Sequence, residues 1–248
     1  MAGEADGRRP VVERPRGPAV AERTERLTSL PNASRGPRAA HDVGPRRGTG
    51  RTRRGRQTRT LLLDAAREVF ERDGYLHARV ADICDVAGIS HGSFYTYFVS
   101  KEAIFREVVD SVELDLLSPE PVPADTDPIE RIRAANRHYL ETYAANAEIM
   151  KVIHQVSTFD DDVLRIRLQR HQAFARAIER RTRMLQDEGL VDPDVDPAYA
   201  AQALGGMVGY LADLLFTTDH GSGFDLDTAV EQLTVLWANA IGVRRHPA

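Results

Sequence analysis

The chain has 248 residues, a formal net charge of −4 and a single cysteine. This length suits a small domain joined to a larger one with a real core. One cysteine excludes a disulfide framework and a cysteine-rich zinc site, and we expect Cys84 to be a small core residue in a reducing compartment. The charge is uneven, because residues 1–56 carry +8 and residues 57–248 carry −12.

The first 56 residues are predicted to be a disordered basic tail. They contain 14 arginines and six prolines without sustained apolar periodicity, so they cannot bury enough surface to offset the entropy of ordering. No apolar run of a secretory signal is present, and we therefore expect a cytoplasmic protein. A flexible arm of this kind can follow the phosphates of DNA, through Arg51, Arg53, Arg54 and Arg56. The alternatives are a solvated tail and an upstream extension from a misassigned translation start.

Three helices are predicted next. The first spans about 57–73, with apolar residues at the helical period, and Gly74 ends it. The second carries an apolar stripe and ends at Gly88, which tolerates the positive φ of a tight turn. Ser90 is a suitable N-cap for the third, in which Phe94 and Phe98 share the inner side. Two short helices around a glycine turn form a helix-turn-helix.

The third helix has the surface chemistry of a recognition helix. Its outer side carries small residues that allow close approach, hydroxyls suited to phosphate oxygens, and a histidine near its N-terminus. Residues 57–105 resemble the DNA-binding domain of the tetracycline-repressor (TetR/AcrR) family, through Gly74-Tyr75, Ala87-Gly88-Ile89-Ser90, Gly92-Ser93-Phe94-Tyr95, Tyr97-Phe98 and Ser100-Lys101-Glu102. Where the family usually has Thr at the start of the second helix, this chain has Ala78, which leaves His77 or Arg79 to serve the nearby backbone.

The resemblance implies the DNA contacts. Phosphates should be held by Tyr95, Tyr97 and Lys101, and Arg79 should approach from the start of the second helix. Nearest the base edges should lie His91, Gly92, Ser93 and Thr96, with Ser90 before them. A fourth helix from Ser100 should couple this head to the rest of the chain, so that 57–117 forms the DNA-binding domain with its connecting helix.

A second, larger helical domain is predicted over 118–248. Four prolines in 118–128 mark its boundary, and further helices are expected over about 128–145, 146–157, 161–187, 197–216 and 227–241. The segment 198–216 is so apolar that it must be buried nearly all round. A membrane span is the competing interpretation, but burial by a partner subunit explains the same composition. The predicted dimer contacts are Gly205, Gly206, Gly209, Leu233 and Trp237, although Trp237 can equally be a core aromatic.

An effector site is predicted within the larger domain. Large apolar side chains are more numerous there than DNA docking needs, and a ligand pocket is mainly apolar with a few polar groups. The candidates are Tyr139, Tyr143, Met150, Ile153, His154, Gln172, Phe174, Met207 and Tyr210. Because none of them is Lys or Arg, we expect a small hydrophobic effector. Metal binding by His138, His154 and His171 is an alternative without helical i, i+4 spacing to support it.

These observations predict an all-α protein with an N-terminal helix-turn-helix domain and a C-terminal ligand-binding and dimerisation domain. No catalytic signature occurs, so no enzymatic activity and no cofactor are expected. The favoured function is a homodimeric transcriptional regulator, a repressor released from a near-palindromic double-stranded DNA operator by its effector. An effector-independent architectural DNA-binding protein is the first alternative, and an all-helical enzyme or carrier is the second.

Overall fold

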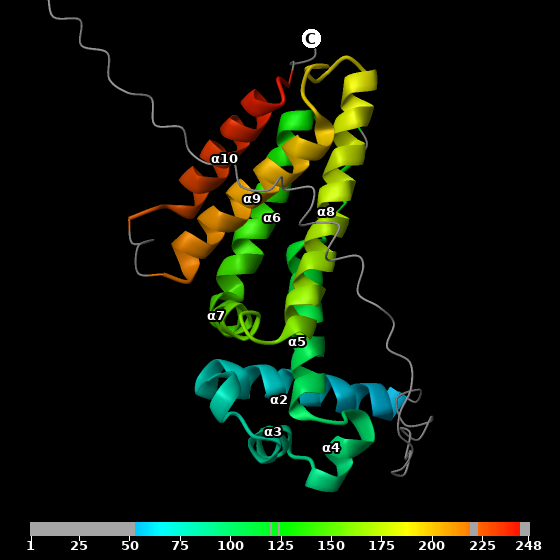
Figure 1. Ribbon diagram of the computed structural model, residues 1–248, viewed down its shortest axis with the longest axis vertical. Helices are drawn as coiled ribbons and strands as arrows, with labels where there is room; N and C mark the ends of the chain where they lie inside the picture. Colours follow the sequence, from blue (N-terminus) through cyan, green and yellow to red (C-terminus); the bar gives the residue numbers. More distant parts are fainter. Residues whose placement is uncertain (1–52, 120, 124, 219–222, 244–248) are drawn as a thin grey trace, which may run out of the picture. The chain divides into compact units, whose positions relative to one another are not determined.

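The computed structural model describes residues 53–119, 121–123, 125–218 and 223–243. Every regular element in these ranges is an α-helix, which confirms the predicted all-α fold (Figure 1). Within the same ranges, no helix combines the length and the apolar character that crossing a bilayer requires. The predicted tail up to residue 52, including Arg51, lies outside the described residues.

The N-terminal helices are α2 (Arg53–His77), α3 (Val80–Ala87) and α4 (His91–Tyr97). Helix α2 begins four residues before the predicted start at Gln57, so Arg53, Arg54 and Arg56 lie on a helix and not in a flexible arm. The expected end of this helix coincides with a break, because Gly74 has φ +71° and a non-helical backbone. The core of the three helices includes Leu62, Phe70, Ile83 and Phe94, all with fully buried side chains.

Helix α5 (Lys101–Leu116) joins these helices to the following ones. Near its start, the Phe105 ring lies 4.9 Å from that of Phe70 and 4.7 Å from that of Tyr75, measured between centroids. Farther along, α5 packs against both α6 and α8. One continuous helix therefore contributes to the core of the helix-turn-helix and to the core of the larger helical region.

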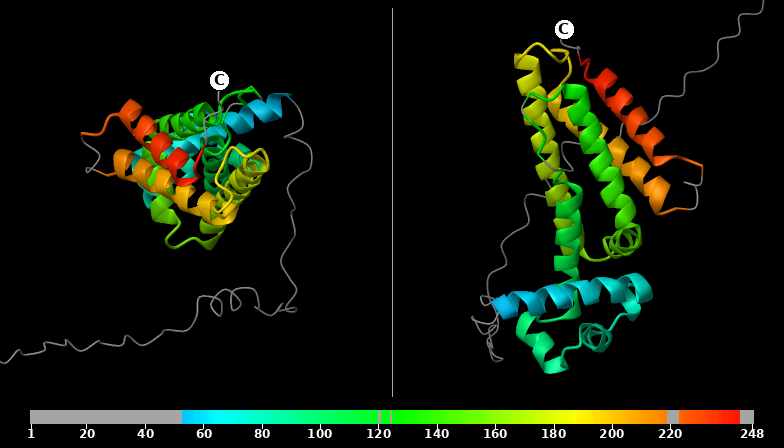
Figure 2. Two further views of the ribbon diagram at one scale, coloured as in Figure 1. Left: turned by 90° about the horizontal axis from the view of Figure 1, so that it is seen from above. Right: turned by 180° about the vertical axis from the view of Figure 1, so that it is seen from behind.

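The larger region contains α6 (Pro128–Ala145), α7 (Ala147–Val156), α8 (Asp161–Asp187), α9 (Pro197–Phe216) and α10 (Leu226–Ala240). An aspartate side chain accepts backbone N–H groups at the start of four of these helices, which satisfies donors that have no partner within the helix. These N-caps are Asp127, Asp160, Asp196 and Asp225. Helix α10 packs mainly on α6, and α9 mainly on α8 (Figure 2).

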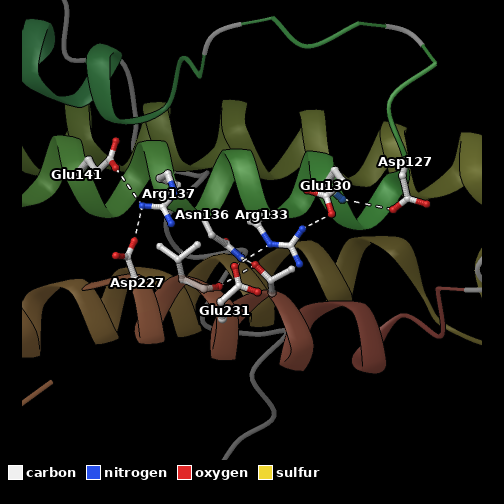
Figure 3. A network of polar contacts seen from close by, with 10 residues as sticks. Asp127, Glu130, Arg133, Asn136, Arg137, Glu141, Asp227 and Glu231 are labelled. Atoms are coloured by element: carbon white, nitrogen blue, oxygen red, sulfur yellow. Dashed lines mark hydrogen bonds and ion pairs between the residues drawn. The ribbon is translucent and has the colours of Figure 1, made fainter. Parts of the chain in front are cut away.

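Charged pairs cross the contact between α6 and α10 (Figure 3). Arg133 donates to Glu231 at 2.8 Å and also pairs with Glu130, one turn back on its own helix. Arg137 lies 2.7 Å from Asp227 and 3.3 Å from Glu141. Such partly exposed pairs contribute little stability individually, but they fix how α6 and α10 lie against each other. The arginines on this side of α6 thus have carboxylate partners.

Candidate nucleic-acid interface and ligand cavity

Helix α4 presents an open polar face because its two phenylalanines hold the opposite face in the core. Phe94 and Phe98 are 0% and 3% exposed. The Ser90 hydroxyl accepts the backbone N–H of Ser93 at 3.3 Å, which caps the N-terminus as predicted. On the outer face, His91, Gly92, Tyr95 and Thr96 are exposed, while Ser93 and Tyr97 are half-buried. This face offers hydroxyl and imidazole groups on a helix that another molecule can approach closely.

The first turns of α2 border the same surface. A hollow lies between α2 and α4, lined by Arg54, Thr58, Gly88, Ile89, Ser90, Ser93, Thr96 and Tyr97. Gly88 forms its turn with φ +64°. Sequence reasoning placed Arg54 in a flexible arm and missed Thr58, because the start of α2 was not recognised. A cationic side chain and several hydroxyls therefore share one hollow, which is the chemistry that binds a phosphate backbone.

The start of α3 has Ala78 in place of the usual Thr, and its cap is formed by Arg79 and Asp82. The Asp82 carboxylate accepts the backbone N–H of Arg79 at 3.2 Å, which is one half of a capping box. It also accepts the guanidinium, with Nε at 2.9 Å and Nη2 at 3.0 Å. This hydrogen bonding lowers the pKa of the Asp82 carboxyl. Arg79 therefore stays exposed at the N-terminus of α3, with its guanidinium held by Asp82 of the same helix.

Lys101 does not lie free at the surface. Its ammonium donates to the carbonyl oxygens of Tyr75 at 2.8 Å and Ala78 at 3.0 Å, and it lies 4.6 Å from the centroid of the Tyr75 ring. These carbonyls belong to the end of α2 and the link to α3, where backbone acceptors lack helical partners. The placement does not support the predicted phosphate contact and instead gives Lys101 a structural role.

The larger region contains a cavity of about 260 Å³ between α6, α8, α9 and α10. Its wall is mostly apolar, and its lining includes Ile132, Tyr139, Phe174, Ile178, Leu185, Val208, Trp237 and Ile241. Of the nine predicted ligand residues, only Tyr139 and Phe174 are in the wall. Burial raises the pKa of the Tyr139 hydroxyl, so this group is a neutral phenol at physiological pH.

The other seven predicted ligand residues lie outside the wall of this cavity. Tyr143, Met150 and Ile153 are core residues, at most 2% exposed. Gln172 and Tyr210 are exposed, and Met207 is half-buried outside the wall. His154 instead lies 3.1 Å from Asp213, measured from Nδ1 to Oδ1. Within the described residues, no three His, Cys, Asp or Glu side chains gather as a metal site would require.

Apart from the Tyr139 hydroxyl, the polar groups of the cavity were not predicted. They are Asn136 and Thr182, which are buried, and Arg131 and Arg181, which are half-buried. The expectation that the pocket contains no Lys or Arg is therefore wrong. Arginine is mostly exposed in proteins, so the sequence alone gives no reason to place Arg181 in an apolar wall.

Four of the five predicted dimer contacts face inward. Leu233 and Trp237 are 1% and 9% exposed within a single subunit, so they are core residues and cannot anchor an interface. Gly205 lines the cavity, and a Cβ at Gly209 would lie 3.5 Å from the Tyr139 hydroxyl oxygen. Gly206 is exposed, and a Cβ there would meet nothing within 4 Å. The outward faces of α9 and α10 instead carry Tyr199, Tyr210, Val235 and Leu236, all exposed.

A helix-turn-helix with an open second helix, joined by one helix to a domain with an apolar cavity, defines a DNA-binding transcriptional regulator. Residues 62–108 match the family model described as bacterial regulatory proteins, tetR family. The DNA-binding segment of the chain therefore matches this family in sequence, as the resemblance predicted.

Two transcriptional regulators are similar to this chain in sequence, and a solved structure has a similar fold. The HTH-type transcriptional regulator UidR of Escherichia coli K12 is 27% identical over 167 residues, which cover 63% of this chain and 81% of UidR. TtgR of Pseudomonas putida, also an HTH-type transcriptional regulator, is 24% identical over 123 residues, or 47% of this chain and 59% of TtgR. The structure of Salmonella enterica GusR is similar with a TM-score of 0.64 at 19% identity, covering 78% of this chain and 99% of that chain.

Proposed function

We propose that the protein is a homodimeric repressor that leaves a near-palindromic operator when a small effector with a mainly apolar body enters the cavity. The observation that carries this proposal is the position of the cavity. Helix α8 lines it with Phe174, Ile178 and Leu185, and an earlier part of α8 is bonded to α5. A ligand that moves or fixes α8 therefore acts on the helix that enters the DNA-binding head.

The bonds along this route are specific. Arg167 of α8 donates to Glu113 of α5 at 3.1 Å, and Arg170 donates to Asp110 at 2.7 Å. At the start of α5, Lys101 holds the carbonyls of Tyr75 and Ala78. A ligand that prefers one arrangement of α5 weakens DNA binding by the ratio of its affinities for the two arrangements.

For DNA contact we propose the open face of α4 and the adjoining hollow. His91, Gly92, Ser93 and Thr96 would lie nearest base edges, and Tyr95, Tyr97 and Ser90 would hold the backbone, aided by Arg79 and by the α2 arginines Arg53, Arg54 and Arg56. The −12 charge of residues 57–248 opposes DNA elsewhere on the molecule, which confines binding to the head and the basic N-terminal segment. Such an operator lies on the bacterial chromosome, so the proposal includes the cytoplasmic location expected from the sequence.

For dimerisation we propose the outer faces of α9 and α10. Tyr199, Gly206 and Tyr210 follow one stripe of α9, and Val235 and Leu236 lie outward on α10. Exposed apolar side chains grouped in this way mark an interaction surface, and a two-fold axis would form a four-helix bundle from two copies of each helix. Two α4 helices about 34–36 Å apart would then meet successive turns of a near-palindromic site.

The test begins with selection of DNA ligands from a random duplex library by the purified full-length protein. Recovery of an inverted repeat supports the dimeric repressor. Small molecules are then screened for release of that operator by fluorescence anisotropy. Ala177→Trp, which adds bulk to the wall of the cavity, should bind the operator but ignore the releasing compound, whereas Ala173→Trp, at an exposed α8 position outside that wall, should respond normally.

The effector-independent architectural protein remains the competing function, and the same experiment separates the two. An architectural protein would recover no preferred sequence, or would bind its sites regardless of any ligand. The apolar cavity favours the repressor, because nothing in DNA docking requires an unfilled space of about 260 Å³ in the second domain.

A further inference from the structure

Two arginines line the mainly apolar cavity. Arg131 of α6 is held by the chain before its helix, since Nε donates to the carbonyl oxygen of Thr126 at 3.0 Å and Nη2 to that of Pro123 at 2.5 Å. Arg181 of α8 is half-buried, and the part of the chain that the structure describes offers it neither a hydrogen bond nor an ion pair. Its positive charge therefore faces the cavity uncompensated.

Other half-buried arginines on the same helices have carboxylate partners, in contrast to Arg181. On α8, the half-buried Arg167 and Arg170 each pair with a carboxylate of α5. On α6, Arg133 and Arg137 each pair with two carboxylates (Figure 3). A partly desolvated charge without a counter-ion is unfavourable, so retention of Arg181 in an apolar wall needs a reason.

Two neutral polar side chains of the wall, Thr182 and Asn136, are already engaged inside the protein, whereas the part of the chain that the structure describes offers the Tyr139 hydroxyl no hydrogen bond. Thr182 donates its hydroxyl to the carbonyl oxygen of Ile178 at 3.0 Å. Asn136 donates to the Thr234 hydroxyl at 3.3 Å, and that hydroxyl donates to the carbonyl oxygen of Val230 at 2.7 Å. Of the two wall groups without a partner among the described residues, Tyr139 is neutral and Arg181 is charged, so Arg181 is the donor that selects an anion.

We propose that the cavity takes an amphipathic organic acid whose carboxylate pairs with Arg181 while its apolar body lies against Phe174, Ile178 and Trp237. A guanidinium binds a carboxylate through two parallel N–H donors, which fixes orientation as well as adding affinity. This inference rests on the proposed function only in taking the cavity as the effector site. It replaces the uncharged hydrophobic effector expected from the sequence.

The size of the cavity limits the apolar body. Its volume of about 260 Å³ lies just below the range of about 300–1,000 Å³ that is common for ligand pockets. A single aromatic ring with a short acidic chain, or a medium-length alkyl acid, matches this space. A small ligand with several charges does not match it, because most of the wall has no polar partner to offer.

Binding can be read from the protein itself, because Trp237 is the only tryptophan of the chain and lines the cavity. Its fluorescence is measured in the full-length protein with 4-phenylbutyrate against 4-phenylbutan-1-ol, and with decanoate against decan-1-ol. Each pair shares an apolar skeleton and differs in the charged group. Charge-assisted hydrogen bonds predict that the acid binds at least about tenfold more tightly than its alcohol.

Variants of Arg181 then test whether this side chain causes the difference in affinity between each acid and its alcohol. Arg181→Met should weaken the acids by about 10- to 100-fold and leave the alcohols within about twofold, and Arg181→Lys should restore part of the loss. Arg180→Met, at the exposed neighbouring position, should change neither the affinity for the acids nor the affinity for the alcohols. Equal affinities of acid and alcohol, equal losses of both in Arg181→Met, or no binding of either acid at millimolar concentration would overturn the proposal.

Operator release separates this proposal from the proposed function. If neutral compounds release the operator from the wild-type protein and from Arg181→Met equally well, the repressor stands and the anionic effector is wrong. If acids bind in the Arg181-dependent manner but leave DNA binding unchanged, the cavity chemistry stands and the repressor is wrong.

Discussion

Arg167 on α8 and Glu113 on α5 form an ion pair in which the carboxylate is 2% exposed. The guanidinium Nε donates to Glu113 at 3.1 Å, and Nη1 donates to the Ser157 hydroxyl at 3.1 Å. The pair joins the helix that lines the cavity to the helix that enters the DNA-binding head. A pair in this position fixes the relative placement of α5 and α8.

Arg167→Met is expected to lower the free energy of unfolding by about 3 kcal/mol, because it leaves the Glu113 carboxylate buried without its counter-ion. The double variant Glu113→Leu with Arg167→Met should recover most of this loss, since no buried charge remains. Urea denaturation measures both. Arg165→Met is the control, because its pair with Asp162 is exposed and should contribute less than about 1 kcal/mol. Equal effects at positions 165 and 167 would contradict the buried-pair argument.

His154 predicts a pH dependence of stability. Burial is the main cause that lowers the pKa of the imidazole below its ordinary 6.5, and the positive charge of Arg167 is the second cause. The Asp213 carboxylate opposes the shift. The folded state therefore binds fewer protons than the unfolded state between the two pKa values. Stability from this group is complete above pH 6.5 and is lost as the pH falls through the folded pKa, by at most about 1.4 kcal/mol per pH unit.

The measurement is urea denaturation over a series of pH values. His154→Gln should flatten the loss of stability below pH 6.5, because the group that must take up a proton is gone. His77→Gln, at the exposed end of α2, should retain the wild-type profile, because His77 does not contribute to the pKa shift of His154. If both variants kept the wild-type pH dependence, another group would be responsible.

The helix-turn-helix could be predicted from the sequence because its determinants are local. Gly88 is needed at positive φ wherever the chain turns so tightly, and it has φ +64° here. Ser90 caps α4 through a residue three positions away. Phe94 and Phe98 lie one turn apart, so their inward direction follows from helical geometry alone.

The cavity and the interface depend on which face of each helix meets which neighbour, and this is not local. Helix α10 has apolar residues on two faces, and the sequence does not distinguish Trp237, which packs toward α6, from Leu236, which points outward. Similarly, Tyr139 and Tyr143 lie one turn apart on α6, yet only Tyr139 lines the cavity. Arg181 was missed because its direction toward the cavity depends on how α6, α8, α9 and α10 are arranged around it.

Lys101 is expected to stabilise the head and not to set the salt dependence of DNA binding. Lys101→Met removes two charge-assisted hydrogen bonds to the carbonyls of Tyr75 and Ala78, and should lower the free energy of unfolding by about 1.5–3 kcal/mol. Urea denaturation provides the measurement. Lys151→Met, at an exposed pair with Glu148, should change it by less than about 1 kcal/mol. A Lys101 variant of unchanged stability, with a salt slope reduced by about one, would return this residue to the phosphate contacts.

Arg54 is expected to contact a DNA phosphate and so to contribute to the salt dependence of DNA binding. It lines the hollow beside α4, so Arg54→Ala should weaken all duplexes similarly and reduce the slope of log affinity against log salt by about one. Arg176→Ala, at an exposed position of α8, should leave both unchanged. Anisotropy titrations at several salt concentrations measure the slope. A loss confined to one DNA sequence would instead indicate a base contact.

A substitution at Gly206 tests the proposed dimer interface of α9 and α10. Its Cβ position is open and its surroundings within the subunit are empty to 4 Å, so Gly206→Glu should fold normally. In the proposed four-helix bundle the same glutamate would be buried without a partner, which disfavours association strongly. Sedimentation should therefore show a monomer at micromolar concentration, and Leu236→Glu should give the same result from α10. Ala173→Glu, on an exposed part of α8, should remain dimeric. If Gly206→Glu and Leu236→Glu both stayed dimeric, the subunits would have to meet through another face.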